Sequence, residues 1–119
     1  MLRRGHYGSY LNSPAWYRKR QQWYVAWRQG TGTVPVCAVC GLIWTLREGD
    51  LHHRTHTRLG RELPTDLVPM CKADHVQLHN LWGAHPSWRT TGRATATLGI
   101  IAVLRRQRRA DGPASRVPA

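Results

Sequence analysis

The chain has 119 residues, which leaves room for one domain. Its formal charge is +12, from 18 Lys and Arg against 6 Asp and Glu, and a polyanionic partner is needed to offset such an excess. Only Lys19 and Lys72 are lysines, and arginine offers a planar fork that binds phosphate oxygens through two hydrogen bonds. We therefore expect nucleic acid as the partner, with an anionic membrane surface as the alternative.

No segment of the sequence is suited to crossing a membrane. The longest strongly apolar run, residues 98–104, is far shorter than the roughly 20 residues that a spanning helix needs. Residues 1–14 are basic and lack the apolar core of a signal peptide. We therefore expect a cytoplasmic protein, in which thiols stay reduced. Because three cysteines cannot all pair in disulfides, metal binding becomes their leading explanation.

The N-terminal part is expected to hold a loose basic arm, residues 1–13, followed by a helix over residues 14–28. Ser13 is a favourable N-cap, and Pro14 suits the first helical position. The glycines of residues 30–32 end the helix. Tryptophans recur along it at helical spacing, at Trp16, Trp23 and Trp27. This stripe is interpreted as a core face, with stacking on nucleic acid bases as the alternative.

Short extended segments and loops are expected in the central part of the chain. Residues 34–51 are predicted to form a β-hairpin region with a Cys-x-x-Cys-Gly turn at 37–41. A polar loop then spans residues 54–65, and a short apolar strand spans residues 66–70. A helix is expected from residue 71 to about residue 82, because apolar and polar residues are interspersed there.

A last helix is predicted from about residue 90 to residue 109, with Leu98, Ile101 and Leu104 on its apolar side. Its end is rich in arginine and is either a solvated helix end or a phosphate-binding patch. Residues 111–119 are rich in Pro, Ala and Gly and are expected to be disordered. The folded domain is therefore expected to span residues 14–110.

Five of the seven histidines lie between residues 52 and 79. His75 and His79 are four apart on an expected helix, so both face one side about 5–6 Å apart and can converge on one divalent ion or one phosphate. His52 and His53 are neighbours at a strand end and point in different directions, so one can bind metal while the other faces the reacting atom. Either pair alone is more simply explained as solvated surface, but their combination with metal-spaced cysteines predicts a site.

The cysteines form a second group. Cys37 and Cys40 have the spacing of a zinc knuckle, and Cys71 and Asp74 repeat that spacing later in the chain. Zinc accepts carboxylate oxygen, so a structural Zn²⁺ site of three thiolates and one aspartate is chemically sound. The alternative is that Asp74 caps the helix or faces water. A redox Cys-x-x-Cys is disfavoured, because no βαβ pattern surrounds it.

The ordered combination of these motifs resembles the HNH (His-metal-finger) endonuclease family. The resemblance covers residues 37–79 and is carried by DLHHRTHTRLGRE at 50–62, DLVPMCKADH at 66–75 and the closing His79. It is strongest for the subgroup with two Cys-x-x-Cys zinc knuckles, which is common in phage and bacterial genomes. It implies a small α+β fold with a ββα-metal core, about residues 34–83, flanked by an N-terminal and a C-terminal helix.

The resemblance also implies roles for single residues. His52 and His75 match the two metal ligands, and His79 matches a further ligand or phosphate-contacting histidine of some members. His53 matches the general base. Asp66 occupies the place of the central Asn, whose side chain holds the loop of the base histidine; an ionised aspartate can accept such hydrogen bonds but cannot donate them.

The activity that the resemblance implies is metal-dependent cleavage of DNA to 5′-phosphate and 3′-hydroxyl ends. The ion would be Mg²⁺ or Mn²⁺, although imidazole ligands also suit Zn²⁺, Ni²⁺ or Co²⁺. Neutral His53 would take a proton from the attacking water, with its ring oriented by an acceptor on the loop of residues 54–65. His56 stands where relatives often have an aromatic residue.

The expected partner is double-stranded DNA, bound by a monomer or a homodimer. Candidate DNA-binding residues are Arg54, Arg58, Arg105, Arg106, Arg108 and Arg109. One alternative is a zinc-stabilised DNA-binding module without catalytic activity, which the aspartate at position 66 favours. Another is a structural or RNA-associated basic zinc protein.

Overall fold

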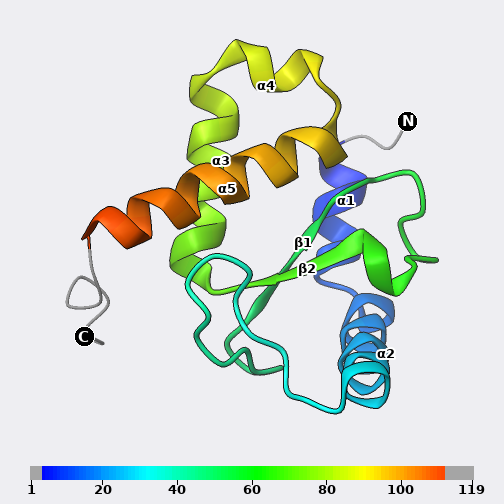
Figure 1. The fold of residues 1–119 in the computed structure, drawn as a ribbon. Helices are drawn as coiled ribbons and strands as arrows, with labels where there is room; N and C mark the ends of the chain where they lie inside the picture. The colour runs from blue at the N-terminus through cyan, green and yellow to red at the C-terminus, as the bar shows by residue number, and fades with distance from the viewer. Residues whose placement is uncertain (1–3, 112–119) are drawn as a thin grey trace.

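The computed structural model describes residues 4–111 as an α+β fold of helices around a two-stranded antiparallel sheet (Figure 1). The elements are α1 (Arg4–Leu11), α2 (Pro14–Thr31), β1 (Asp50–His53), the 3-10 turn η1 (Pro64–Asp66), β2 (Leu67–Met70), α3 (Lys72–Ala84), α4 (Pro86–Thr90) and α5 (Arg93–Asp111). Within this part of the chain, none of the helices combines the length and apolar character required to cross a bilayer.

Helix α1 occupies residues for which a loose arm was predicted, so that prediction is wrong for residues 4–11. Tertiary contacts explain the difference: the Tyr10 hydroxyl donates to both carboxylate oxygens of Glu62 at 2.8 Å, and Leu11 packs against a cluster of tryptophans. The predicted start of α2 is confirmed, because the Ser13 hydroxyl accepts from the backbone N–H of Trp16. Residues 1–3 of the expected arm and the expected tail from 112 to 119 lie outside the described residues.

The predicted hairpin over residues 34–51 is confirmed only around the cysteine turn, where Val36 and Ile43 form an antiparallel bridge. Its end is wrong, because residues 50 and 51 belong to β1, which pairs with β2. This bridge is the single strand-like pairing of residues 34–49, and the rest of the segment consists of turns and irregular loop, including the turn that carries the first two cysteines. Gly41 closes this turn with a φ of 77°, in the left-handed region that glycine adopts without steric cost. The turn is fixed to the sheet by the Ala38 N–H, which donates to the Pro69 carbonyl at 2.8 Å.

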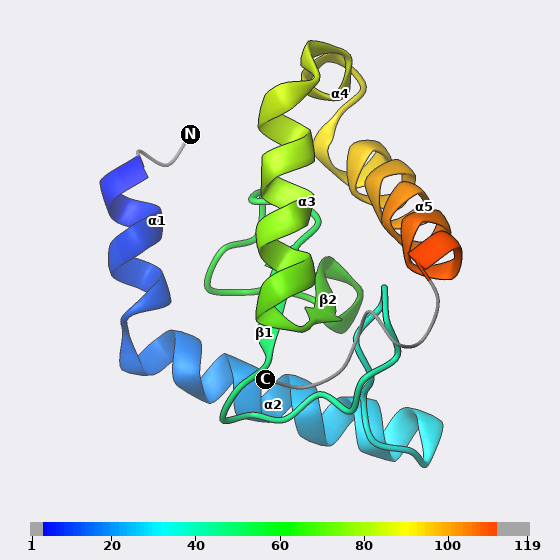
Figure 2. The same cartoon turned by 90° about the vertical axis from the view of Figure 1, so that its left-hand side faces the viewer.

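The two strands lie between two apolar clusters, with α3 on one side and α2 on the other (Figure 2). The α3 side is built from Cys37, Val39, Met70, Leu78, Ile100, Ile101 and Leu104. The α2 side is built from Trp16, Trp23, Trp44, Leu51 and Leu67, so the core interpretation of Trp16 and Trp23 is confirmed. Because side chains alternate along a strand, β1 directs His52 toward the first cluster and His53 toward the second.

The C-terminal helix begins later than expected, because α4 intervenes between α3 and α5. Trp88 of α4 packs so closely on α5 that a Cβ at Gly99 would lie 2.6 Å from its ring. Helix α5 buries Ile101 and Leu104 as predicted, but Leu98, which was expected on the same side, is 59% exposed. The small residues Ala96 and Thr97 are fully buried in its place, and α5 packs against α3.

Candidate metal centre and active site

The three cysteines and Asp74 come together beside the start of α3. Their ligand atoms all lie within 4.8 Å of one another, with 4.0 Å between the sulfurs of Cys40 and Cys71. Oδ2 of Asp74 lies 3.3 Å from the Cys37 sulfur and 3.2 Å from the Cys71 sulfur. Ligand atoms on a tetrahedral zinc with bonds of about 2.0–2.3 Å are about 3.3–3.8 Å apart. The four residues could therefore hold one metal ion.

Asp74 is fully buried, which contradicts the alternative that it faces water. Capping does not explain it either, since the Cys71 sulfur, not Asp74, accepts the N–H at the start of α3. Burial raises the pKa of Asp74, but hydrogen bonds from Arg108 and the cysteine thiols outweigh this effect and hold the pKa below its ordinary value. The carboxylate is thus anionic, with Oδ1 paired to Arg108 and Oδ2 directed at the sulfurs.

His52, His75 and His79 form a second cluster, on the α3 side of the sheet. Nδ1 of His52 lies 3.3 Å from Nε2 of His75, which lies 3.1 Å from Nε2 of His79. Nitrogens bound to one divalent ion at about 2.1 Å are about 3.0–3.4 Å apart. The three imidazoles could therefore share one ion, and the expected convergence of His75 and His79 is confirmed.

Neighbouring groups orient the two less exposed imidazoles of this cluster. Nδ1 of His75 lies 3.0 Å from Oδ2 of Asp50, and Nε2 of His52 lies 2.9 Å from the Thr97 hydroxyl. Each contact occupies the ring nitrogen that faces away from the cluster, an arrangement typical of metal-ligating histidines. Burial, assisted by the charge of Arg93, lowers the pKa of His52 to about 2. His52 is therefore neutral at pH 7, the state in which imidazole binds metals.

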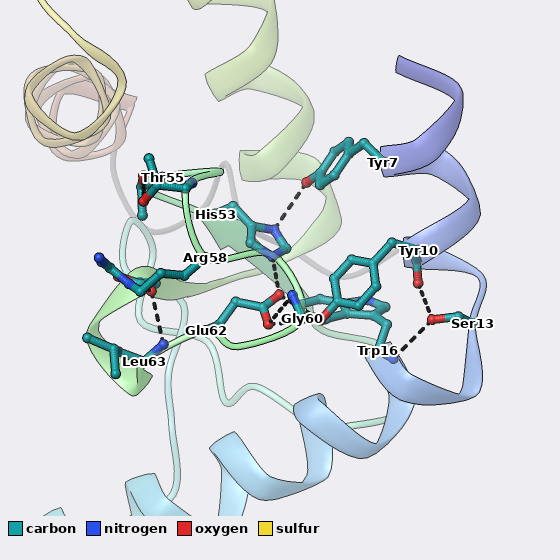
Figure 3. A network of polar contacts seen from close by, with 12 residues as sticks. Tyr7, Tyr10, Ser13, Trp16, His53, Thr55, Arg58, Gly60, Glu62 and Leu63 are labelled. Carbon is teal, nitrogen blue, oxygen red and sulfur yellow. Dashed lines mark hydrogen bonds and ion pairs between the residues drawn. The ribbon is translucent and has the colours of Figure 1, made fainter. Parts of the chain in front are cut away.

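His53 points to the opposite side of β1 and is fully buried beside Trp16. Its Nε2 lies 2.8 Å from Oε2 of Glu62, and its Nδ1 lies 3.1 Å from the Tyr7 hydroxyl (Figure 3). Glu62 is the acceptor that was expected on the loop of residues 54–65. Burial lowers the pKa of His53 below its ordinary value, although the Glu62 carboxylate opposes this effect. The geometry is that of a neutral imidazole held by a carboxylate, which is how general bases are oriented.

Asp66 holds the loop that follows β1, which is the task expected of the residue in this position. Its side chain accepts the N–H of Leu63 at 2.9 Å and forms a two-bond ion pair with Arg58, while its carbonyl accepts the N–H of Arg54. All of these contacts use Asp66 as an acceptor, so the aspartate needs no proton to perform them. The side chain does not contact His53 through any hydrogen bond among the described residues.

Arg93, at the start of α5, contacts His53, and its charge also acts on His52 and His79 of the three-histidine cluster. Its Nε donates to the backbone carbonyl of His53 at 2.7 Å, and its guanidinium lies over the Trp82 ring. Its charge lowers the pKa of His52 and of His53, in both cases as a smaller effect than burial. A cation fixed in this position could pair with a phosphate that reaches both groups.

Sequence reasoning did not assign five residues that contact the histidines. They are Tyr7, Asp50, Glu62, Arg93 and Thr97. Asp50 and Glu62 are the first and last residues of the motif at 50–62, so their positions in it could have identified them. The other three come from helices outside it, and only the tertiary fold brings them to the site.

Most of the arginines proposed for DNA binding also hold the protein together. Arg58 pairs with Asp66, Arg108 pairs with Asp74, and Arg105 donates to the Ala38 carbonyl at 2.7 Å. Arg54 donates to the Thr65 carbonyl at 3.3 Å. The remaining two, Arg106 and Arg109, are exposed on the last turns of α5.

No family model, curated protein or solved structure matches this chain.

Proposed function

We propose that this chain is a metal-dependent DNA endonuclease of the HNH type. The observation that carries the proposal is the division of neighbouring histidines across β1. His52 belongs to a cluster of three imidazoles that could bind a divalent ion. His53 instead forms a hydrogen bond with the buried carboxylate of Glu62, which could orient it as a general base. The order of β1, loop, β2 and α3 agrees with a ββα-metal core over about residues 34–83. The charge of +12 agrees with a nucleic acid substrate.

The metal would be held by His52, His75 and His79, with Mg²⁺ or Mn²⁺ as the first candidates. A divalent ion there supplies Lewis acidity that offsets the negative charge of the scissile phosphate. Asp50 and Thr97 keep two of the imidazoles in the orientation that binding requires. A second ion, Zn²⁺, would be held by the cysteines and Asp74 and would stabilise the fold.

The protein's own groups perform the proton transfer. His53 takes up the proton that the attacking water loses as its oxygen bonds to phosphorus, while the 3′-oxygen leaves and takes a proton from solvent. Glu62 stabilises the imidazolium that forms, because it accepts a hydrogen bond from Nε2 and is itself 5% exposed. Arg93, which is fixed beside His53, pairs with the phosphate. The products carry a 5′-phosphate and a 3′-hydroxyl.

The test of this function is cleavage of supercoiled plasmid by purified protein with Mg²⁺, with Mn²⁺ and with EDTA. We expect nicking with at least one of the ions and none with EDTA. Sealing of the nicks by a DNA ligase without end repair should demonstrate 5′-phosphate and 3′-hydroxyl ends. A shift in gel mobility without nicking, under all ions, would instead support a DNA-binding module without catalysis. The complete burial of His53 is the observation that favours this second candidate.

Exposed charge at the end of α5 should contribute to DNA affinity in a sequence-independent way. The variant Arg106→Ala, Arg109→Ala is expected to bind all duplexes more weakly and to reduce the slope of log affinity against log salt by about 1–2, because each phosphate contact contributes about 0.9. Folding should be unaffected, since both side chains are exposed. Titrations at several salt concentrations measure the slope. The control is Arg106→Lys, Arg109→Lys, which should keep it; an unchanged slope in the alanine variant would remove these residues from the interface.

A further inference from the structure

His53 has no contact with solvent, although a general base must exchange a proton with its substrate. Its side chain is 0% exposed, and both ring nitrogens have partners. The carboxylate of Glu62 occupies Nε2, and the hydroxyl of Tyr7 occupies Nδ1 (Figure 3). A proton can therefore reach or leave this ring only through one of these two groups.

The hydrogen bonds of Glu62 decide which ring nitrogen carries the proton. Glu62 accepts from the Tyr10 hydroxyl at 2.8 Å and from the Gly60 N–H at 3.0 Å, contacts that fit an ionised carboxylate. An ionised carboxylate only accepts, so Nε2 of His53 must be the donor to it. Nδ1 of the neutral ring then holds a lone pair, and the Tyr7 hydroxyl donates to that lone pair. The basic atom of His53 is thus the one that Tyr7 covers.

Tyr7 is held in place from several sides but is only partly buried. Its ring lies against the exposed His56, with 4.4 Å between centroids, and meets the His53 ring edge-on at 5.6 Å. Burial raises the pKa of Tyr7, and the nearby charge of Arg93, whose Nε donates to the His53 carbonyl at 2.7 Å, opposes this effect. Tyr7 therefore contacts both the buried base His53 and the exposed His56.

We infer that Tyr7 is a further catalytic residue, which relays the proton from the attacking water to His53. This inference rests on the proposed endonuclease function. Water donates its proton to the phenolic oxygen while the phenolic proton passes to Nδ1 of His53, so Tyr7 ends the step neutral. The water oxygen bonds to phosphorus, the bond from phosphorus to the 3′-oxygen breaks, and the 3′-oxygen takes a proton from solvent. The imidazolium is held beside Glu62 until its proton returns to solvent by the same route.

The test is Tyr7→Phe, which removes the hydroxyl and keeps the ring that packs on His56. Single-turnover cleavage at saturating DNA and Mn²⁺ is expected to slow at least about 10-fold. This is less than the about 100-fold or more usual for loss of a proton-transfer group, because a water molecule can enter the vacated space. DNA affinity and melting temperature should stay at parental values. The control is Tyr17→Phe, since Tyr17 is 57% exposed on α2, and it should cleave at the parental rate.

A second measurement uses the parent chain and needs no variant. The cleavage rates in mixtures of H₂O and D₂O should curve with deuterium fraction, because two protons move in the relayed step. A linear dependence in the parent overturns the relay. A Tyr7→Phe variant that cleaves as fast as the parent or faster also overturns the relay, because Tyr7 would then only cover Nδ1 of His53. A covalent protein–DNA adduct that requires Tyr7 overturns it as well, because Tyr7 would then be the nucleophile.

Failure of the relay and failure of the proposed function give different results. If the parent nicks DNA and His53→Ala does not, while Tyr7→Phe matches the parent, only the relay is wrong. If the parent nicks no DNA with Mg²⁺, Mn²⁺, Ni²⁺, Co²⁺ or Zn²⁺, the endonuclease function is wrong and the relay with it.

Discussion

Replacement of Cys37 or Cys71 by serine is expected to abolish both zinc binding and cooperative unfolding. The knuckle segment, residues 34–49, has almost no regular structure, and Cys37 is one of the buried residues through which it packs against β2 and α3. Structural zinc contributes about 10–16 kcal/mol in small domains, as much as or more than the whole stability of about 5–15 kcal/mol of a typical domain. Elemental analysis should find about one zinc per parent chain and none in either variant. Circular dichroism during heating should show a cooperative transition for the parent alone.

Two further variants separate zinc ligation from the ion pair beside it. Asp74→Ala should lose zinc affinity, because its Oδ2 faces two sulfurs. Arg108→Ala should keep the zinc and lower the melting temperature by several degrees, because it removes the ion pair that Arg108 forms with the buried carboxylate of Asp74. Retention of zinc and of the parental melting temperature in Asp74→Ala would exclude Asp74 as the fourth ligand. Folded parent protein that contains no zinc would exclude the zinc site itself.

Local periodicity explains what could be predicted of the site from the sequence. Alternation along a strand separates His52 from His53, and the spacing of four on a helix brings His75 to His79. Both rules depend only on backbone geometry within one element, and the structure agrees with both. The cysteine group was predictable for a similar reason, since the turn after Cys37 and the first turn of α3 each fix their pair of ligands locally.

The remaining features depend on contacts between distant segments. Helix α1 contains two glycines, and its own sequence favours a helix only weakly. It is attached to the rest of the protein by the hydrogen bond between Tyr10 and Glu62, which are 52 residues apart. The pairing of β1 with β2 likewise bridges a loop, whereas the sequence suggested a closer partner. Arg93 is one arginine among many, and only the packing of α5 beside α3 brings it to the carbonyl of His53.

His53→Ala and His52→Ala are expected to fail in different ways, although the residues are neighbours. His53→Ala should keep the divalent ion and bind DNA nearly as the parent does, yet cleave at least about 100-fold more slowly, the usual contribution of a general base. His52→Ala and His75→Ala should instead bind the catalytic ion more weakly, so an excess of Mn²⁺ should recover part of their rate. Zinc should remain bound in all three, because its ligands are other residues. Plasmid nicking across a series of Mn²⁺ concentrations distinguishes the two kinds of loss.

The pH dependence of cleavage gives a second measure of the base. Burial lowers the pKa of His53 below its ordinary value of 6.5, although Glu62 opposes this effect. Because a base works when neutral, the parental rate should rise with pH until it passes this lowered pKa and then level off. His53→Ala should lack that rise, and His53→Gln, which fills more of the buried space, should lack it too while melting closer to the parent. If His53→Ala cleaves as fast as the parent, the base is another group, and His56, whose ring lies 5.8 Å from that of His53, is the next candidate.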